Sequence, residues 1–333
     1  MSLPSTMRHV AVRAPGGADQ LAILDAPLPT LAAGEVLIDV AYAGVNRPDI
    51  AQRAGHYPPP SDASPILGLE VSGTVAARAP DVTTWNVGDR VCSLVAGGGY
   101  AEYCAAPAAW CMRLPPKVSL AEAAGVPENY FTVWYNLVER VGLKSGESVL
   151  IHGGSSGIGL AAIQLAHALG ATVLTTAGSE DKVAFCLVMG ADHAIDYKTL
   201  DFVAEVARIT GKRGVDVVLD MVGGDYIEKN LRTLASDGRL SIIAFQKGSR
   251  VEVDWVTIMA KRLTVTGSTM RRSPFARKTA LAAALQSKVW PLFDAGTLKV
   301  VVDSTYKLDD VAEAHRRLET SRHIGKILLE VGS

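Results

Sequence analysis

A glycine-rich turn, set between a short apolar run and a helical pattern, constrains the fold of this chain more than any other feature. Residues 149–151 (VLI) suit a strand that is buried on both faces of a parallel sheet. The turn at residues 152–159 (HGGSSGIG) follows at once, and a compact apolar pattern then continues to Gly170. Another strand-like run occupies residues 172–177. The order strand, glycine turn, helix and strand predicts a dinucleotide-binding unit.

The turn has the chemistry that a dinucleotide pyrophosphate requires. Such a group needs a backbone without obstructing Cβ atoms, N–H groups that point at it, and a helix N-terminus that stabilises its charge. Against the pattern G-x-G-x-x-G, we expect Gly154 to make the tight turn and Gly159 to allow close helix packing, whereas Ser156 replaces the middle glycine. That serine must either keep its side chain off the ligand or hydrogen-bond to it. The expected contacts in the turn are Gly154, Ser155, Ser156, Gly157, Ile158 and Gly159.

The turn also resembles the T-G-x-x-x-G-x-G pattern of short-chain dehydrogenases, but the rest of the chain argues against that class. Those enzymes carry the turn at the N-terminus and use a Tyr-x-x-x-Lys pair as a proton relay. Here about half of the chain precedes the turn, and none of the nine tyrosines has a lysine four residues later.

Length and composition are those of a globular protein with two domains. The chain has 333 residues, of which 48% are hydrophobic and 20% charged, so a substantial core can form. The net charge of -1 does not suggest binding to nucleic acid or to a membrane through bulk electrostatics.

The four cysteines indicate a reducing compartment. They form no C-x-x-C pair, and the sequence shows neither a signal segment nor a membrane-spanning apolar run, so we expect a cytoplasmic protein. Cys104 and Cys111 are candidate metal ligands, but we expect them to be buried as small hydrophobic residues.

Short strands separated by turn residues predominate before the glycine turn, which predicts a compact β-barrel-like domain. The expected strands are residues 8–14, 35–45, 71–77, 90–95 and 100–106. Ser119 and Glu122 form a capping box that opens a short helix, and a second helix is expected at residues 130–141.

After the glycine turn, strands alternate with helices, which predicts one doubly wound parallel sheet. The expected strands are residues 149–151, 172–177, a segment near 194, 215–220, 238–244 and 263–267. A helix at residues 274–293 follows. The tail is expected to form a strand at 300–302, a helix opened by an Asp310–Glu313 capping box, and a strand at 326–331, and to return to the first domain.

Six strings along the chain carry a family resemblance. They are AGVNRPD (residues 43–49), GHYPPP (55–60), ILGLEVSG (66–73), VGDRV (87–91), GGGYAEY (97–103) and IHGGSSGIG (151–159). Together with the order of elements, they resemble the medium-chain dehydrogenase/reductase superfamily. Within it they look like the zinc-independent quinone oxidoreductases, in particular the branch that contains the p53-inducible quinone oxidoreductase.

The resemblance covers nearly the whole chain and implies its architecture. The implied fold class is α/β, with a doubly wound parallel Rossmann sheet that binds NADP and a GroES-like catalytic domain of β-barrel type. The Rossmann domain would span residues 129–270, and the catalytic domain would comprise residues 7–128 and 271–333. The resemblance also implies a homodimer.

The resemblance also bears on zinc. In the zinc alcohol dehydrogenases of the superfamily, metal ligands follow the A-G-x stretch, lie in a G-H-E string and precede the nucleotide half. This chain has Asn46 at the first position and Leu69 at the second, and residues 113–148 contain neither Cys nor His. Because leucine offers no lone pair to a metal, we expect no metal site.

Without a metal, the acceptor must already be electrophilic. A quinone or a conjugated enone accepts hydride from nicotinamide C4 with little activation, and its oxygens can take protons from water. We therefore expect an NADPH-dependent quinone reductase. Two alternatives stay open: a reductase of α,β-unsaturated aldehydes or ketones, and a non-enzymatic nucleotide-binding protein of the crystallin-like or RNA-binding kind.

The resemblance also assigns catalytic roles to single residues. It places Asn46 and Thr132 near the nicotinamide, where both would serve catalysis and cofactor binding, with Arg47 and Asp49 beside them. It places Tyr57 in the substrate cleft, where the ring could stack on a quinone or hydrogen-bond to it.

The end of the second strand after the glycine turn favours NADPH over NADH. NAD enzymes place an acidic residue there for the ribose 2′-hydroxyl, whereas NADP sites have a small residue and a nearby cation. This chain has Gly178 and Ser179 there, with Lys182 one helical turn later. Glu180 or Asp181 could reach a 2′-hydroxyl if the turn were shifted.

Further cofactor contacts are expected from the resemblance and from the geometry of the sheet. By resemblance, Tyr197 flanks the 2′-phosphate and Lys326 contacts the cofactor. Ligands of doubly wound sheets lie outside the carboxyl ends of the strands, so the loops after the last three strands are expected to line the nicotinamide side. The residues expected there are Val222, Phe245, Gln246, Ser268, Thr269 and Met270.

Overall fold

The computed structural model describes residues 3–332 and divides into two compact units. One unit comprises Met1–Phe131 together with Arg271–Ser333, and the other is Thr132–Met270. Within the described residues, no helix is both long enough and apolar enough to cross a bilayer.

The unit Thr132–Met270 is built on a six-stranded sheet in which neighbouring strands are parallel. The strand order is β10-β9-β8-β11-β12-β13. The strands are β8 (Ser148–Ile151), β9 (Thr172–Ala177), β10 (His193–Asp196), β11 (Val215–Asp220), β12 (Leu234–Ile242) and β13 (Thr264–Gly267). The doubly wound parallel sheet expected from the sequence is confirmed.

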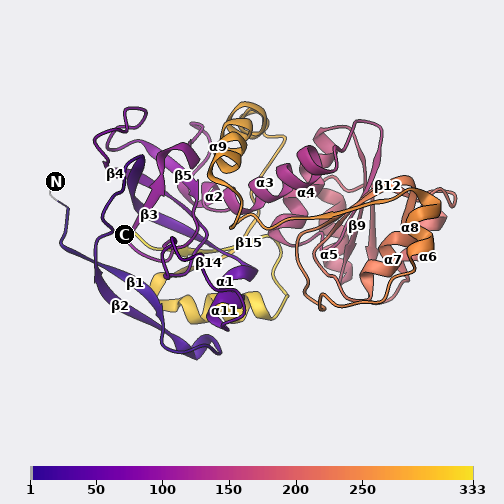
Figure 1. Cartoon of the computed structure of the whole chain (residues 1–333), viewed down its shortest axis with the longest axis horizontal. Coiled ribbons are helices and arrows are strands. Elements are labelled where there is room, and N and C mark those ends of the chain that lie inside the picture. Colours follow the sequence, from indigo (N-terminus) through magenta and orange to yellow (C-terminus); the bar gives the residue numbers. More distant parts are fainter. Residues whose placement is uncertain (1–2, 333) are drawn as a thin grey trace. The chain divides into compact units, whose positions relative to one another are not determined.

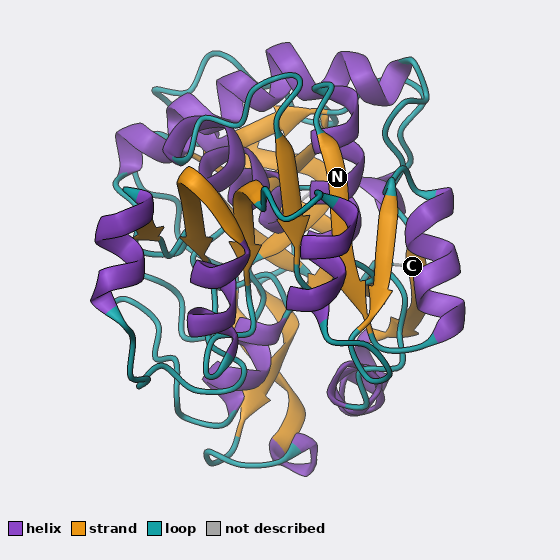
Figure 2. Ribbon diagram, turned by 90° about the vertical axis from the view of Figure 1, so that its right-hand side faces the viewer, coloured by secondary structure: helices purple, strands orange, loops and turns teal. Residues whose placement is uncertain are grey.

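Helices cover both faces of this sheet (Figures 1 and 2). From β8 the chain moves one way through β9 to β10, then crosses back to β11 and moves the other way to β13. Because such crossovers are right-handed, the helices of the two halves lie on opposite faces. They are α4 (Gly157–Ala168) and α5 (Glu180–Val188) in the first half, and α6 (Phe202–Ile209), α7 (Tyr226–Thr233) and α8 (Trp255–Lys261) in the second.

Side-chain caps fix where four of these helices begin. Ser156, Ser179, Asp201 and Asp254 each accept a hydrogen bond from a backbone N–H in the first turn of the following helix. Each cap satisfies a donor that the helix start would otherwise leave unpaired. The caps agree with the alternation of strands and helices expected after the glycine turn.

The unit Met1–Phe131 with Arg271–Ser333 contains a seven-stranded sheet and a two-stranded one. The larger sheet has the order β14-β15-β3-β4-β5-β7, with β6 paired to β3, and β1 pairs with β2. The strands are β1 (Thr6–Val12), β2 (Leu21–Pro27), β3 (Glu35–Val45), β4 (Glu70–Arg78), β5 (Arg90–Leu94), β6 (Tyr103–Pro107), β7 (Cys111–Arg113), β14 (Val302–Lys307) and β15 (Lys326–Glu330). Since β15 lies between β14 and β3, the tail returns to this unit as expected.

Short helices occur between the strands of this unit along the chain. They are η1 (Ala18–Gln20), α1 (Arg47–Arg53), η2 (Ala108–Trp110), α2 (Leu120–Ala123), α3 (Pro127–Val133), α9 (Phe275–Ala284), η4 (Leu285–Val289), α10 (Trp290–Asp294), η5 (Leu308–Asp310) and α11 (Val311–Glu319). The Ser119–Glu122 capping box at the start of α2 is confirmed. The helix expected at 130–141 is α3 continued by the π-helix η3 (Trp134–Arg140).

Several elements differ from the expectations. The strands β2 and β7 and the helix α1 were not expected, and the strand expected at 300–302 is β14, at Val302–Lys307. The helix expected at 274–293 is interrupted by the π-helix η4. The Asp310–Glu313 capping box is wrong, because Asp310 makes no side-chain cap bond to α11.

The four cysteines are buried and free. Burial raises the pKa of the Cys104 and Cys111 thiols to about 12, so both stay protonated at neutral pH. They therefore pack as small apolar side chains, as expected.

Candidate functional site

The glycine turn lies between β8 and α4, at the carboxyl end of the parallel sheet. Gly153 has a φ of 68°, a conformation that favours glycine, and Gly154 has no positive φ. The expectation that Gly154 makes the tight turn is therefore wrong, because Gly153 makes it. A Cβ on Gly154 would collide with the Thr175 side chain and lie 3.0 Å from the Cys186 Sγ. Gly154 thus lets the turn pack closely against β9 and α5.

The hydroxyl group of Ser156 is engaged within the turn. It donates to the Gly153 carbonyl at 2.8 Å and accepts from the Gly159 N–H at 3.0 Å. The sequence left two possibilities, a side chain kept off the ligand or one hydrogen-bonded to it. The bonds within the turn correspond to the first, because the hydroxyl group is engaged by the backbone. Ser156 therefore stabilises the turn and the helix start together.

Close packing at the start of α4 is confirmed. A Cβ on Gly159 would lie 2.6 Å from the Gly154 carbonyl carbon. The first intrahelical bond runs from the Leu160 N–H to the Ser156 carbonyl at 2.8 Å. The N–H groups of Gly157 and Ile158 precede that bond, so they can donate to an anion at the helix N-terminus.

The end of β9 brings together the residues expected at the 2′-position of the ribose. The Ser179 hydroxyl caps α5 by accepting from the Lys182 N–H. A Cβ on Gly178 would lie 2.6 Å from the Tyr197 hydroxyl, so that ring lies against this glycine. Burial raises the pKa of the Cys186 thiol to about 12, and the Lys182 ammonium opposes the rise. Lys182 therefore lies near Cys186, which itself lies against the glycine turn.

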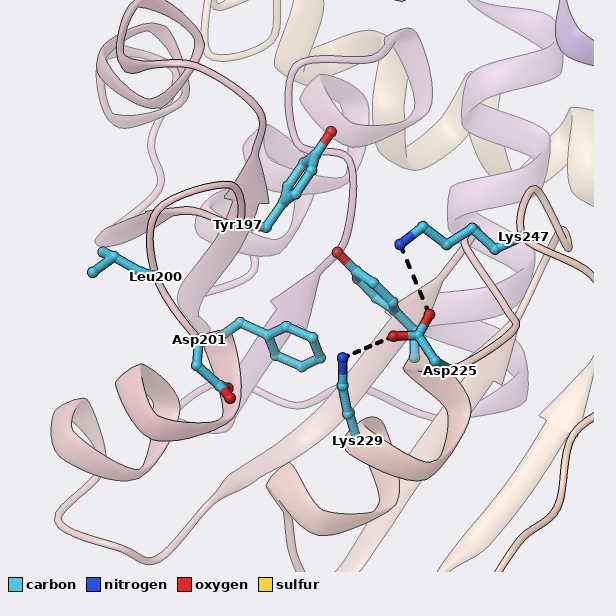
Figure 3. Close-up of a pocket in the computed structure, with 8 residues that line it drawn as sticks. Tyr197, Leu200, Asp201, Asp225, Lys229 and Lys247 are labelled. Carbon is cyan, nitrogen blue, oxygen red and sulfur yellow. Dashed lines mark hydrogen bonds and ion pairs between the residues drawn. The ribbon is translucent and has the colours of Figure 1, made fainter.

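A pocket of about 210 Å³ opens beside Tyr197, at the carboxyl ends of β10, β11 and β12 (Figure 3). Asp225 pairs with Lys229 at 2.7 Å and with Lys247 at 3.8 Å. The Lys247 ammonium lies 4.7 Å from the centre of the Tyr226 ring. The pocket is lined by Tyr197, Leu200, Asp201, Phe202, Asp225, Tyr226, Lys229 and Lys247. Of these residues the sequence pointed only to Tyr197, although Lys247 directly follows Gln246.

Asn136 connects two of the residues expected near the nicotinamide. Its Nδ2 donates to the Thr132 carbonyl at 2.9 Å, and its Oδ1 accepts from the Ser268 hydroxyl at 3.0 Å. The Ser241 hydroxyl also donates to this Oδ1. Asn136 was missed in the sequence because its partners Ser241 and Ser268 lie more than 100 residues away.

The loops after β11, β12 and β13 contain the remaining expected residues. The buried Asp220 carboxylate accepts from the Val222 N–H at 2.7 Å, which fixes the loop after β11. Phe245 is 47% exposed and Gln246 is exposed, whereas Met270 is buried. Thr269 is exposed beside Ser268.

In the other unit, Asn46 and Lys326 belong to one buried network. The Asn46 Nδ2 donates to Glu70 Oε1 at 2.9 Å, and the Lys326 ammonium donates to Asn46 Oδ1 at 2.7 Å. Lys326 also pairs with Glu70, and all three side chains are buried. The pairing compensates both buried charges and fixes the orientation of the amide. Glu70, which the sequence analysis did not single out, is therefore the centre of this network.

Two further acids lie close to this network. Burial raises the pKa of Asp49 to about 6, although the Asn46 N–H, the Tyr100 hydroxyl and the Gly68 N–H donate to it. Burial and the Glu70 charge raise the pKa of Glu128 to about 8, against the opposing charge of Lys326. Glu128 therefore holds a proton at neutral pH.

Tyr57 lies half-buried beside a buried arginine. The Arg271 Cζ atom lies 5.4 Å from the centre of the Tyr57 ring. Burial raises the pKa of the Tyr57 hydroxyl, Glu128 raises it further, and Arg271 opposes the rise. Tyr57, Glu128 and Arg271 thus act on one another within a single unit.

The positions considered for zinc carry side chains that do not fit a metal. Asn46 is hydrogen-bonded to Glu70 and Lys326, and Leu69 is a buried apolar residue. Over residues 3–332, no group of three or more His, Cys, Asp and Glu side chains is arranged to hold a metal ion.

Two family models match the chain. Residues 157–286 match a zinc-binding dehydrogenase model, and residues 32–116 match an alcohol dehydrogenase GroES-like domain model. Among curated proteins, the quinone oxidoreductase of Homo sapiens is 33% identical over 332 residues, which cover 97% of this chain and 97% of that protein. The similarity therefore extends over both units.

Solved structures show the same fold. An NAD-dependent alcohol dehydrogenase aligns with a TM-score of 0.88 at 33% identity over 98% of this chain and 100% of that one. A mycobacterial protein complexed with NADPH aligns with a TM-score of 0.88 at 32% identity over 97% and 99%. The CurK enoyl reductase aligns with a TM-score of 0.87 at 27% identity over 99% and 100%. These proteins differ in cofactor and in reaction, so similarity alone does not choose among them.

Proposed function

The chain belongs to the quinone oxidoreductase family of the medium-chain dehydrogenase/reductase superfamily, and from this membership we propose that it is an NADPH-dependent quinone reductase that works without a metal ion. Membership in the family by itself means that the chain is an NAD(P)-dependent oxidoreductase of this superfamily with a small-molecule substrate. Its cytoplasmic location, expected from the cysteines, stays a prediction.

The residues at the carboxyl end of β9 are the observation that supports the choice of NADPH. A small residue, a capped helix start and a cation lie together there as Gly178, Ser179 and Lys182, with Tyr197 against the glycine. A 2′-phosphate needs such a cation and hydroxyl donors, whereas an NAD site usually has a carboxylate at the end of this strand.

The glycine turn fits the pyrophosphate of the same cofactor. Gly153, Gly154 and Gly159 let the turn pack closely on Met221, on Thr175 and on its own backbone, and the N–H groups of Gly157 and Ile158 can hold the phosphate oxygens. When bound, NADPH supplies the hydride. The chain itself binds and orients the cofactor and holds the acceptor beside it.

The other unit supports an acceptor that needs no metal. The Asn46–Glu70–Lys326 network is a neutralised, hydrogen-bonded cluster, and the family's zinc positions carry Asn46 and Leu69. A quinone is electrophilic enough to accept hydride when it is positioned and shielded from water. Tyr57 offers a half-buried aromatic face for a flat quinone ring.

A fluorescence titration with NADPH and NADH, followed by turnover with a panel of quinones, tests the proposal. We expect NADPH to bind more tightly than NADH and to be oxidised when a quinone is added. Tight NADPH binding without turnover of any acceptor would favour the crystallin-like or RNA-binding alternative. Equal binding of both nucleotides would contradict the assignment of Lys182.

Glu128 favours one second candidate, the reduction of α,β-unsaturated aldehydes or ketones. Hydride addition to the β-carbon of an enone gives an enolate, and the α-carbon then needs a proton. Glu128 holds a proton at neutral pH and lies near Tyr57. Saturated carbonyl products from enones, with no turnover of quinones, would establish this reaction in place of the first.

We also propose that the enzyme is a homodimer formed through the edge of β13. This strand ends the six-stranded sheet, and Val265 on it is 45% exposed. The preceding helix α8 exposes Trp255 by 74% and Met259 by 73%. A second copy that pairs with this edge about a two-fold axis would cover both the strand and these side chains.

A further inference from the structure

We propose that Arg271 binds the carbonyl oxygen of the acceptor and stabilises the negative charge that develops there during reduction. The inference rests on the proposed function, since it concerns the acceptor side of the same reaction. It adds a substrate-binding cation beside Tyr57, the residue that the sequence assigned to the substrate cleft.

Arg271 is a buried cation with an unsatisfied donor. Its side chain is 6% exposed, and among the described residues its Nη2 atom has no hydrogen-bond partner. Its Nε donates to the Ala96 carbonyl at 2.7 Å, which fixes the plane of the guanidinium. A buried N–H group without an acceptor is unfavourable, and native proteins retain such groups where a ligand supplies the acceptor.

The guanidinium lies beside the aromatic ring expected to hold the acceptor. Its Cζ atom lies 5.4 Å from the centre of the Tyr57 ring, and its Nη1 lies 3.5 Å from the Tyr57 carbonyl oxygen. An arginine over an aromatic face is oriented by it and presents its remaining N–H groups sideways. Tyr57 and Arg271 therefore offer a flat quinone one face for stacking and one donor for its oxygen.

A second buried cation supports the position of Arg271. The Lys278 side chain is 3% exposed, and its Nζ donates to the Arg271 carbonyl at 2.8 Å. The same Nζ lies 4.3 Å from the centre of the Trp110 ring. Burial lowers the pKa of both Arg271 and Lys278, and the Arg271 charge lowers the pKa of Lys278 further. Two like charges are thus held together in a region of low polarity.

The nearby acids do not neutralise Arg271 through an ion pair. Glu70 pairs with Lys326, and Asp49 is occupied by the Asn46 N–H, the Tyr100 hydroxyl and the Gly68 N–H. Glu128 is protonated at neutral pH. Arg271 therefore has no carboxylate as a direct partner among the described residues, and an electron-rich oxygen can take that place.

Such a cation accelerates the proposed reaction beyond what positioning alone provides. When a quinone takes up hydride at one carbonyl oxygen, the ring electrons shift to the other carbonyl oxygen and give a hydroquinone monoanion, which then takes one proton from water. An enone takes up hydride at its β-carbon and gives an enolate with the same negative oxygen. A fixed N–H donor on a cation stabilises this oxygen in the transition state more than in the substrate. The arginine keeps its own protons throughout.

Replacing Arg271 by methionine tests the assignment, because methionine keeps an apolar stem and removes the charge. We expect kcat/KM for quinones to fall about 100- to 1,000-fold, while the Kd of NADPH changes less than about threefold. The matched control is Arg272→Met, which removes an exposed neighbouring arginine and is expected to leave kcat/KM nearly unchanged. A fall no larger than that of the control would overturn the proposal.

A binding measurement separates this inference from the proposed function. 4-Nitrophenolate, an aromatic anion that cannot be reduced by hydride at its oxygen, is titrated into the full-length protein by calorimetry. We expect Arg271→Met to weaken its binding by about tenfold or more relative to wild type and to Arg272→Met. If no quinone or enone is turned over but this difference is found, the proposed function fails and the anion site stands.

Arg271→Lys keeps the test decisive if the methionine variant does not fold. Lysine retains the buried charge but lacks the planar fork. We expect a folded protein whose kcat/KM for quinones is about tenfold lower than that of wild type, with the larger loss for quinones that are harder to reduce. Wild-type kcat/KM and wild-type 4-nitrophenolate affinity in this variant would show that the fork does not contact the acceptor.

Discussion

At the level of a single side chain, we expect Lys182 to determine the choice between the two nicotinamide nucleotides. It lies in the first turn of α5, three residues after the Ser179 cap. Replacing it by glutamate reverses the charge that we assign to the 2′-phosphate. We expect the Kd of NADPH to rise about 10- to 100-fold and that of NADH to rise less than about threefold, as measured by nucleotide fluorescence.

The exposed Lys212 offers a matched control in the same unit. Lys212→Glu makes the same change in net charge away from β9, so it is expected to leave both affinities nearly unchanged. Equal losses of NADPH and NADH in Lys182→Glu would mean that the 2′-phosphate is bound elsewhere.

Glu128 makes the stability of the enzyme depend on pH. Its pKa is raised from 4.5 to about 8, first by burial and then by Glu70. Between these two values the folded state binds more protons than the unfolded state, so the free energy of unfolding falls as the pH rises. The stabilising proton is present below pH 4.5 and is lost as the pH passes about 8.

Glu128→Gln removes this dependence, because the amide stays neutral at every pH. We expect the variant to match wild type near pH 5 and to exceed it near pH 9 by on the order of 2 kcal/mol, a value kept low because the side chain is partly exposed. Thermal unfolding at both values measures this difference. The exposed Glu252→Gln is the control, and a gain of equal size at both pH values would contradict the assignment.

The junction of β8, the turn and α4 depends on Gly159 as a packing element. A Cβ there would lie 2.6 Å from Gly154 backbone atoms, so the helix start must move away from the turn. We expect Gly159→Ala to lower the free energy of unfolding by about 1–3 kcal/mol and to raise the Kd of NADPH at least tenfold.

Gly142→Ala separates the packing effect from ordinary backbone strain. Gly142 has a φ of 58°, and a Cβ on it would meet no atom within 4 Å. Its replacement is expected to cost about 1 kcal/mol through strain and to leave NADPH binding unchanged. The idea fails if Gly159→Ala binds NADPH as tightly as Gly142→Ala does.

The parallel sheet was the most predictable part of the fold. The expected bounds of β9 and β11 agree with Thr172–Ala177 and Val215–Asp220, because strands buried on both faces are continuous apolar runs between turn residues. The strand β2 was missed because none of its residues is fully buried and it ends at a proline, and β7 because it has only three residues. The helix α1 was missed because RPDIAQR is too short for a clear apolar period.

The candidate site was predictable only where its residues lie close together in the sequence. The glycine turn and residues 179–182 lie close together in one βαβ segment of the sequence. The local sequence pattern was therefore enough to predict them. Glu70, Glu128 and Arg271 were missed because their roles come from burial and from partners that are distant in the sequence. The error at Gly154 has another cause: the motif gives the spacing of the glycines, whereas the backbone angle at Gly153 follows from how the turn packs on β9.

For the assembled protein, the edge of β13 makes the oligomeric state testable. An exposed parallel edge with apolar side chains is prone to pair with another chain unless something covers it. Because a two-fold axis brings the same strand of both copies together, one lysine introduced at the edge places two like charges at the interface. Val265→Lys is therefore expected to convert the dimer into a monomer that keeps its affinity for NADPH.

Sedimentation velocity of wild type and Val265→Lys, with Val188→Lys as control, measures this change. Val188 is 81% exposed at the end of α5, within the same unit but away from β13, so its replacement adds the same charge without affecting the edge. A monomeric wild type, or a Val265→Lys protein that stays dimeric, would exclude β13 as the interface. If both lysine variants became monomeric, net charge rather than the strand edge would govern association.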